Sequence, residues 1–213
     1  MPKTILNKWQ ITARELTSIV ENNPSLRGML LGYVAEKKFH DMFLGHEGIS
    51  KIGKADDHDR KRKGDRHIVY KGVDIVIEVK SLQTNTIRKL DDGTWYGKTQ
   101  VDASDRRVVC LPNGEKLETT CLVAGEFDLL AINLFAFEEK WRFVFAKNEN
   151  LPRSSWKGYT YEQRQYLLAT LMDVTWPPKP PYHEDPYLLL EEFVRERKRE
   201  LLFPTESFIK TKK

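Results

Sequence analysis

The sequence predicts an α/β fold, with a mixed central β-sheet of about five or six strands flanked by helices. β-rich runs on both sides of Lys71-Gly72 predict a hairpin within residues 65–80, because a Gly there suits a tight two-residue turn. Residues 127–135 and 141–146 are apolar at nearly every position, which is typical of strands covered on both faces. Helical periodicity before and after these runs supplies the flanking layers.

Composition limits the class of protein. The 213 residues suit a single domain, with a core over about residues 25–146 and a helical C-terminal region over about residues 160–203. Lys and Arg total 35 against 31 Asp and Glu, and this excess of +4 permits a nucleic-acid partner without requiring one. The N-terminus lacks the apolar core of a signal peptide, and no apolar run approaches the roughly 20 residues of a membrane span. We therefore expect a cytoplasmic protein without a membrane partner.

The two cysteines do not suggest a zinc site. Cys110 and Cys121 each lie in an apolar, strand-like run and lack the paired spacing of zinc ligands. Two buried, reduced thiols are favoured over a disulfide.

Two helices are predicted before the hairpin. Residues 11–21 form the first, in which Thr12 is the N-cap and Glu15, three residues later, completes a capping box. The second begins at residue 24 or 25 and ends at about Phe43.

Glu36 stands out in the second helix. Steps of three and four residues place it within a predicted apolar face that also contains Met29, Tyr33, His40 and Phe43. Because a carboxylate directed at the core needs a partner, Glu36 is either bonded to a Lys or a backbone amide, or belongs to a functional site.

Residues 45–64 form a predicted polar loop that ends in Arg60-Lys61-Arg62-Lys63. The Asp and His cluster at residues 56–59 is more typical of a solvated surface than of a metal site. A basic run is usually solvated as well, but this one directly precedes Asp65, where it could hold a phosphodiester backbone.

The register of the hairpin brings two acids together. If Tyr70 pairs with Val73, Asp65 falls opposite Glu78, where Cβ atoms are roughly 5 Å apart and like charges are destabilising. A cation between the carboxylates would reverse that penalty. Lys80 lies on the same face, since side chains alternate along a strand. A simpler alternative is an ordinary hairpin in which Lys80 neutralises both acids.

The motif Asp65…Glu78-Val79-Lys80 resembles the signature of the PD-(D/E)xK nuclease superfamily. One position departs from the pattern, because Gly64 stands where the signature has Pro. The resemblance implies a restriction-endonuclease-like core and hydrolysis of phosphodiesters with Mg²⁺, for which Mn²⁺ could substitute.

The resemblance also implies roles for individual residues. Asp65 and Glu78 would bind the metal ion with their carboxylates, and Val79 would add its carbonyl oxygen. Lys80 would orient or deprotonate the attacking water, and Glu36 would be a third acid at the site.

Polar and basic residues follow the hairpin and are predicted to contact DNA, because chain that leaves the active-site edge of a sheet must pass the substrate. The predicted contacts in this segment are Gln83, Asn85, Arg88, Gln100, Arg106 and Arg107.

Two further acids are not assigned to the site. Asp74 shares the face of Glu78 but lies four residues away, about 13 Å along a strand, which is too far to bind the same ion. Asp128 heads a predicted strand and is interpreted as a turn residue.

The remainder of the chain predicts mostly structural elements. Asn113-Gly114 marks a second hairpin. Residues 161–174 are predicted to be helical, and Pro177–Pro181 forms a stiff connector. Residues 188–202 form a last helix whose end is basic through Arg195, Arg197, Lys198 and Arg199, and it could pack back on the domain, contact DNA or mediate dimerisation.

These expectations together favour a DNA endonuclease of the restriction or defence type. A repair or junction-cleaving nuclease and a non-catalytic DNA-binding subunit that keeps the fold are the alternatives. Because cutting both strands normally needs two sites, a homodimer is expected.

Overall fold

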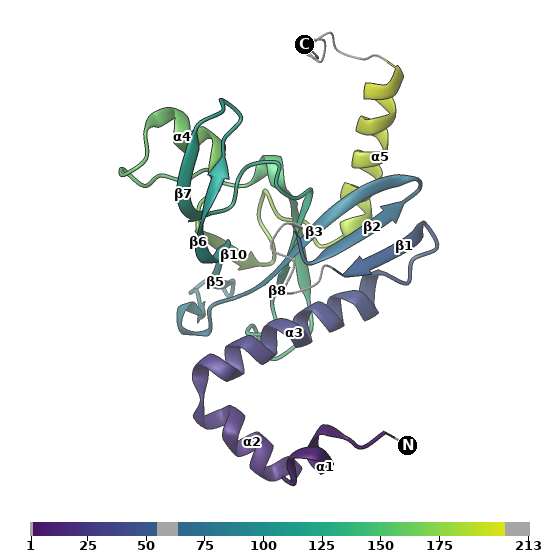
Figure 1. Cartoon of the computed structure of the whole chain (residues 1–213), viewed down its shortest axis with the longest axis vertical. Coiled ribbons are helices and arrows are strands. Elements are labelled where there is room, and N and C mark those ends of the chain that lie inside the picture. The colour runs from purple at the N-terminus through teal and green to yellow at the C-terminus, as the bar shows by residue number, and fades with distance from the viewer. Residues whose placement is uncertain (1, 55–63, 203–213) are drawn as a thin grey trace.

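The computed structural model describes residues 2–54 and 64–202 (Figure 1). The helices are α1 (Ile5–Trp9), α2 (Ala13–Asn22), α3 (Pro24–Phe43), α4 (Tyr161–Tyr166) and α5 (Pro186–Leu202), with short 3-10 turns η1 (Thr84–Thr86) and η2 (Asn148–Asn150). The strands are β1 (Ile49–Lys54), β2 (Arg66–Tyr70), β3 (Val73–Ser81), β4 (Arg88–Lys89), β5 (Trp95–Gln100), β6 (Asp102–Cys110), β7 (Lys116–Cys121), β8 (Leu129–Asn133), β9 (Phe143–Lys147) and β10 (Leu171–Trp176).

The central sheet has five strands in the order β1-β2-β3-β8-β9. The β3–β8 pair is parallel and the other pairs are antiparallel, so the sheet is mixed. The predicted α/β class and the predicted sheet size are therefore confirmed. Every residue of β8 and β9 is buried, as their continuous apolar runs predict.

The two faces of the sheet are covered differently. On one face, Ile75, Ile77 and Val79 of β3 pack with Phe39 of α3 and with side chains of α5. On the other face, β8 and β9 pack against β5, β10 and the connecting segments. Glu78 and Lys80 alternate with the first set along β3, so they point to the face that the helices do not cover.

Two smaller sheets lie beside the central one. β10, β5 and β4 form a three-stranded sheet, and β6 and β7 form a two-stranded hairpin. The hairpin turns at Asn113-Gly114, where Gly114 has φ +88°, so the predicted second hairpin is confirmed.

The first hairpin has the predicted register. Tyr70 pairs with Val73, and both turn residues have positive φ, 46° at Lys71 and 84° at Gly72, as a two-residue turn of the primed type requires. The regular ladder ends with Arg66 opposite Ile77.

Three predictions of local structure are wrong. The helix over residues 161–174 ends at Tyr166, because residues 171–176 alternate between exposed and buried and pair as β10 with β5. Within the predicted loop 45–64, residues 49–54 form edge strand β1. Cys110 is exposed, whereas Cys121 is buried as predicted, and both thiols are free.

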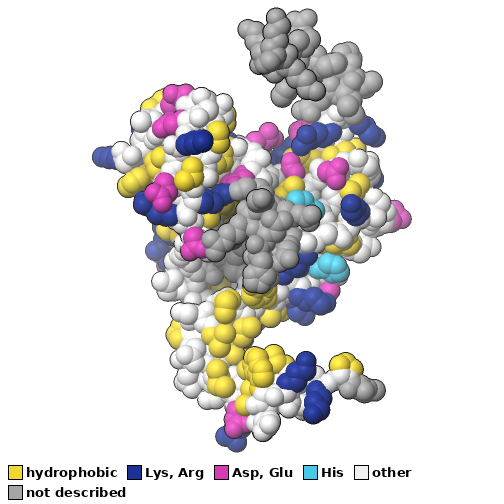
Figure 2. Space-filling view, viewed as in Figure 1, with side chains coloured by type: hydrophobic (Ala, Val, Ile, Leu, Met, Phe, Trp, Pro, Cys, Tyr) yellow, Lys and Arg dark blue, Asp and Glu magenta, His cyan; other side chains and the backbone are white. Residues whose placement is uncertain are grey.

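Helix α3 has an apolar face other than the predicted one. Ala35 and Phe39 are its buried residues, whereas Met29 and Tyr33, placed on the core face by the sequence, are exposed. The first half of α3 extends with α1 and α2 away from the sheet, and hydrophobic side chains gather on this N-terminal arm (Figure 2). The capping box of Thr12 and Glu15 at the start of α2 is confirmed.

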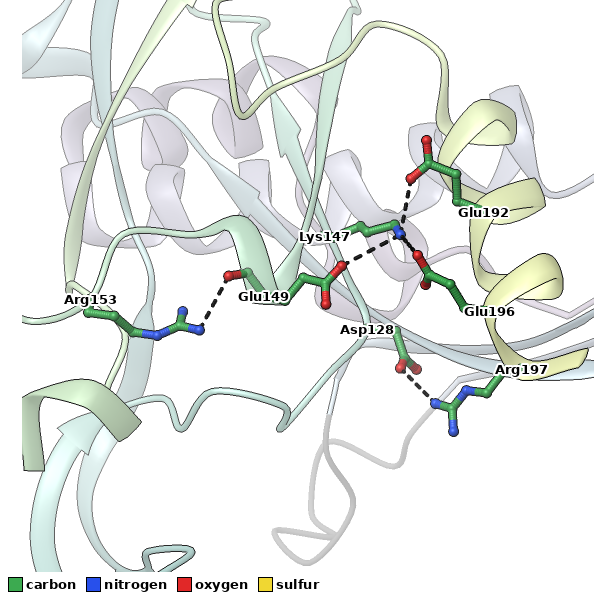
Figure 3. A network of polar contacts seen from close by, with 7 residues as sticks. All are labelled: Asp128, Lys147, Glu149, Arg153, Glu192, Glu196 and Arg197. Carbon is green, nitrogen blue, oxygen red and sulfur yellow. Dashed lines mark hydrogen bonds and ion pairs between the residues drawn. The ribbon is translucent and has the colours of Figure 1, made fainter. Parts of the chain in front are cut away.

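Helix α5 packs back on the sheet, one of its three predicted roles. Its Glu192 and Glu196 reach the nearly buried Nζ atom of Lys147 at 3.0 and 2.6 Å, and Glu149 adds a third carboxylate at 3.6 Å (Figure 3). Arg197 meets Asp128 at 3.4 Å. Among the described residues, no helix is long and apolar enough to cross a membrane.

Candidate active site

Asp65 stands at the point where β2 leaves the regular ladder. It is not the ladder partner of Glu78 that the register predicts. Instead, its amide donates to the carbonyl of Ile77 at 2.9 Å, and its Oδ2 atom accepts from the amide of Val79 at 2.7 Å. Asp65 is therefore bonded to the two residues that flank Glu78, which fixes its carboxylate beside that side chain.

The backbone conformation at residue 64 explains why Gly stands where the PD-(D/E)xK signature, which the motif resembles, has Pro. Its φ of +71° is closed to proline, which is restricted to φ near −65°. A Cβ atom at this position would lie 2.4 Å from Cγ1 of Val76 and 3.0 Å from the carbonyl oxygen of Ile77. Glycine thus permits the close approach to β3 that places Asp65.

Glu78 and Lys80 form an ion pair on the face of the sheet that the helices do not cover. The Nζ atom of Lys80 lies 2.6 Å from Oε1 of Glu78, and the Glu78 side chain is nearly buried. Burial raises the pKa of Glu78, and the charge of Asp65 raises it further, while Lys80 acts against both. Lys80 therefore offsets only part of the cost of burying the negative charge of Glu78 beside Asp65.

The surroundings of Lys80 favour its charged form. Burial alone would lower the pKa of Lys80, but the carboxylates of Glu78 and Asp65 outweigh burial, so that the pKa is raised. Of the two predicted roles, orienting a water molecule and countering negative charge suit this lysine better than deprotonation does.

Glu36 approaches the same end of the sheet from α3. Its Oε2 atom lies 3.1 Å from Arg66 and 3.2 Å from Lys54. Burial raises the pKa of Glu36, and the charge of Asp65 raises it further, so the two acids are neighbours. Glu36 is thus paired with two cations, in line with the prediction of a carboxylate that is bonded within the protein. It also lies near the candidate site, in line with the alternative prediction of a functional acid.

Two acids near the site were not predicted. Asp102, at the start of β6, contributes to the raised pKa of Lys80, and Glu126 contributes to the raised pKa of Glu78. Both come from segments far along the chain from residues 65–80, and no local pattern marks them. Arg66, the partner of Glu36, is marked only by its alternation with the buried Ile68 and Tyr70.

The side chains predicted to contact DNA differ in whether they are exposed or already hydrogen-bonded within the protein. Asn85, Arg88 and Arg106 are exposed, although Arg88 lies over the ring of Tyr96. Gln83 donates to Gln100 at 2.9 Å, and Gln100 donates in turn to Asp102.

Arg107 is engaged within the protein. Its guanidinium binds the carboxylate of Glu126 in a bidentate pair, with distances of 2.5 and 2.6 Å. The basic run Arg60–Lys63 lies outside the described residues.

The donor set suits Mg²⁺ better than a metal held entirely by protein. Within residues 2–54 and 64–202, no group of three or more His, Cys, Asp or Glu side chains could hold an ion. Mg²⁺ prefers oxygen ligands, is commonly bound through one or two carboxylates and retains several waters. Asp65, which is bonded to Ile77 and Val79, and Glu78 between those two residues could supply the two carboxylates.

Comparisons with known proteins leave the family open. No protein-family model and no curated protein matches the chain. Among solved structures, a bacterial homing endonuclease, I-Ssp6803I, is similar over 65% of this chain and 87% of its own, with 17% identity and a TM-score of 0.35. A TM-score this low does not establish a shared fold, so the function of this protein is inferred from the residues of the candidate site alone.

Proposed function

We propose that this protein is a Mg²⁺-dependent DNA endonuclease of the restriction or defence type. One observation carries the proposal: the hairpin register and the bonds of Asp65 to Ile77 and Val79 bring Asp65, Glu78 and Lys80 together at one end of β3. An ordinary hairpin has no need for two neighbouring acids and a half-buried lysine at that position.

The chemistry follows from the charges. Mg²⁺ bound by Asp65 and Glu78, with the carbonyl of Val79, would neutralise the scissile phosphate and lower the pKa of a bound water, and Mn²⁺ could replace it. Lys80, which stays protonated, would hold the attacking water and stabilise the negative charge of the transition state. Glu36 would act as an outer acid that, with Arg66, supports the position of Asp65.

The surroundings suit a nucleic-acid backbone. A groove of ≈ 290 Å³ crosses β1 and β2, and Lys51, Lys54 and His67 are among the residues that line it. We propose that DNA follows this groove and the exposed Asn85, Arg88 and Arg106, with the side chains of Arg60–Lys63, Gln83, Gln100 and Arg107 as the remaining predicted contacts.

The restriction or defence role rests on a compact chain with an arginine-containing segment after the catalytic strand. Cutting both strands of a duplex normally takes two sites, so we also propose that the protein acts as a homodimer.

Cleavage of supercoiled plasmid tests the proposal. The wild type should nick and linearise the plasmid with Mg²⁺ and not with EDTA, and Glu78→Ala should abolish cutting. The exposed Glu118 on β7 provides a control, and Glu118→Ala should cut like the wild type. Equal cutting by the wild type and Glu78→Ala would refute the assignment, whereas DNA binding without cutting by the wild type would support the non-catalytic alternative.

A further inference from the structure

Helix α3 carries two apolar faces. Ala35 and Phe39 are buried in the domain. In the first half of the helix, Met29, Leu30, Tyr33 and Val34 follow helical spacing on another side, and all four are exposed, Leu30 to 39% and Tyr33 to 45%. Within the described residues, the second face is therefore largely uncovered, and the ammonium group of Lys54 lies 5.1 Å from the centre of the Tyr33 ring at its edge.

The helices before α3 add to this surface. No residue of α1 or α2 is buried, and Trp9 is exposed to 60%. Ile19 of α2 is exposed as well, whereas Leu16 and Val20 are half-buried. Figure 2 shows hydrophobic side chains gathered along this arm. We call Trp9, Ile19, Met29, Leu30, Tyr33 and Val34 the N-terminal apolar face.

We propose that the N-terminal apolar face binds the same face of a second copy of this chain. Six half-exposed large side chains present on the order of 500 Å² of apolar surface, which lies toward the upper end of the roughly 300–600 Å² of the largest patch on a typical monomer, a size that is often functional. A partner in an interface of standard size contributes roughly 800 Å², including a polar rim. The face is therefore about large enough for the core of a stable dimer.

The shape and the charges of the arm favour a second copy over other partners. Helices α2 and α3 are joined at Asn23 and diverge from it, so that with α1 they form an arm that extends from the domain (Figure 1). A two-fold axis would place the same apolar side chains of two such arms opposite each other, which makes the contact self-complementary. Within residues 13–34, Arg14 and Arg27 balance Glu15 and Glu21. A face that binds DNA or an acidic protein would carry mainly cations, whereas balanced charges around an apolar centre are compatible with self-association.

The same helix connects this face to the candidate site. Glu36 follows Leu30 by six residues, about 9 Å along α3. Pairing of the arms would therefore hold two candidate sites on one helical frame. This consequence rests on the proposed function, whereas the self-association itself does not.

Sedimentation velocity of the full-length protein without DNA tests the proposal. The wild type should form a dimer. Leu30→Glu and Tyr33→Glu, which place a charge in the apolar centre, should weaken dimerisation at least roughly 100-fold and give monomers. Leu188 on α5 provides a matched control, since it is a helical leucine exposed to 59%, and Leu188→Glu should remain dimeric.

Folding of each variant is verified by circular dichroism, and the substituted side chains are exposed, so native spectra are expected. A wild type that stays monomeric over the concentration series, or a Leu30→Glu variant that dimerises like the wild type, would overturn the proposal. A dimer that does not cut plasmid would contradict the proposed function alone. A monomer that cuts would contradict the dimer alone.

Discussion

Two lysines of this protein, Lys147 and Lys80, have opposite surroundings. Lys147 is 3% exposed, and its partners Glu149, Glu192 and Glu196 are at least 43% exposed. At the end of β3 the acid Glu78 is the more enclosed group, since Glu78 is 11% exposed and Lys80 is 24% exposed. In the first cluster solvated acids surround a buried cation, and in the second a partly exposed lysine faces an enclosed acid that also has the half-buried Asp65 beside it.

The difference separates a structural cluster from a candidate catalytic one. Around Lys147, water and three carboxylates compensate the one buried charge, and the contacts tie α5 to β9 (Figure 3). Beside Lys80, burial and the charge of Asp65 keep the pKa of Glu78 raised, although the lysine acts to lower it. A further cation would therefore stabilise the ionised form of Glu78. Only the second arrangement stands to gain by binding a metal ion.

Removal of a carboxylate that we propose as a metal ligand should have the largest effect. Asp65→Asn should lower the cleavage rate at least roughly 1000-fold, because several kcal/mol of charge stabilisation would be lost. Glu118 on β7 is exposed and does not line the groove proposed for DNA, and Glu118→Gln should cut like the wild type. Comparable losses in both variants, measured in single-turnover assays, would show that a general loss of negative charge is responsible.

The two lysines should respond in different assays. Lys80→Met should lower the cleavage rate about 100-fold by removing a charge from the transition state. Lys147→Met should leave the rate of folded protein unchanged. It should lower the free energy of unfolding in urea by about 2 kcal/mol, less than for a fully buried pair, because its glutamates are exposed. Loss of cleavage in Lys147→Met at full folding would contradict the distinction.

Acidic pH should weaken Mg²⁺ binding earlier than expected for ordinary carboxylates. Burial, followed by the charge of Asp65, raises the pKa of Glu78, so this carboxylate takes up a proton at a pH above the ordinary value of 4.5. Below its raised pKa, affinity should fall about tenfold per pH unit, because one proton competes with the ion. Calorimetric titration of Mg²⁺ over a pH series measures this, and a constant affinity down to pH 4.5 would be inconsistent with the raised pKa.

Substitution of the two adjacent arginines, Arg106 and Arg107, should have the smallest effects. Arg107 resembles Lys147, since Glu126 satisfies it within the protein, whereas Arg106 is exposed. Arg106→Ala should weaken DNA binding a few-fold and reduce the salt dependence of binding by about one ion. Arg107→Ala should instead lower the melting temperature. The reverse pattern in binding and melting experiments would exchange the two roles.

The sequence predicts those parts of the fold in which a pattern is local. Gly72 in the turn and the apolar runs of β8 and β9 are sufficient for the hairpin register and the central sheet. Strand β1 was missed because four of its six residues are exposed at the sheet edge, so its side chains do not alternate. Strand β10 was missed because the leucines before it continue the helical spacing of α4, although Leu167 and Leu168 are buried in isolated bridges.

The candidate site likewise contains residues that a local sequence pattern predicts and residues that no local pattern predicts. Alternation along β3 determines the relative positions of Glu78 and Lys80, and the hairpin register brings Asp65 close to them, although its bonds to Ile77 and Val79 rather than ladder pairing fix its position. The contributions of Asp102 and Glu126 depend on how distant segments fold over the sheet, which no local pattern encodes. The exposure of Met29 and Tyr33 could not be predicted either, because an uncovered apolar stripe and a core stripe have the same spacing in a sequence.

The most direct test pairs one glutamate from each cluster. Plasmid cleavage with Mg²⁺ and urea unfolding would be measured for Glu78→Gln and Glu196→Gln, two substitutions of the same chemistry. The account predicts that Glu78→Gln loses cleavage and remains folded, and that Glu196→Gln keeps cleavage and is less stable. Cleavage at the wild-type rate by Glu78→Gln would contradict it.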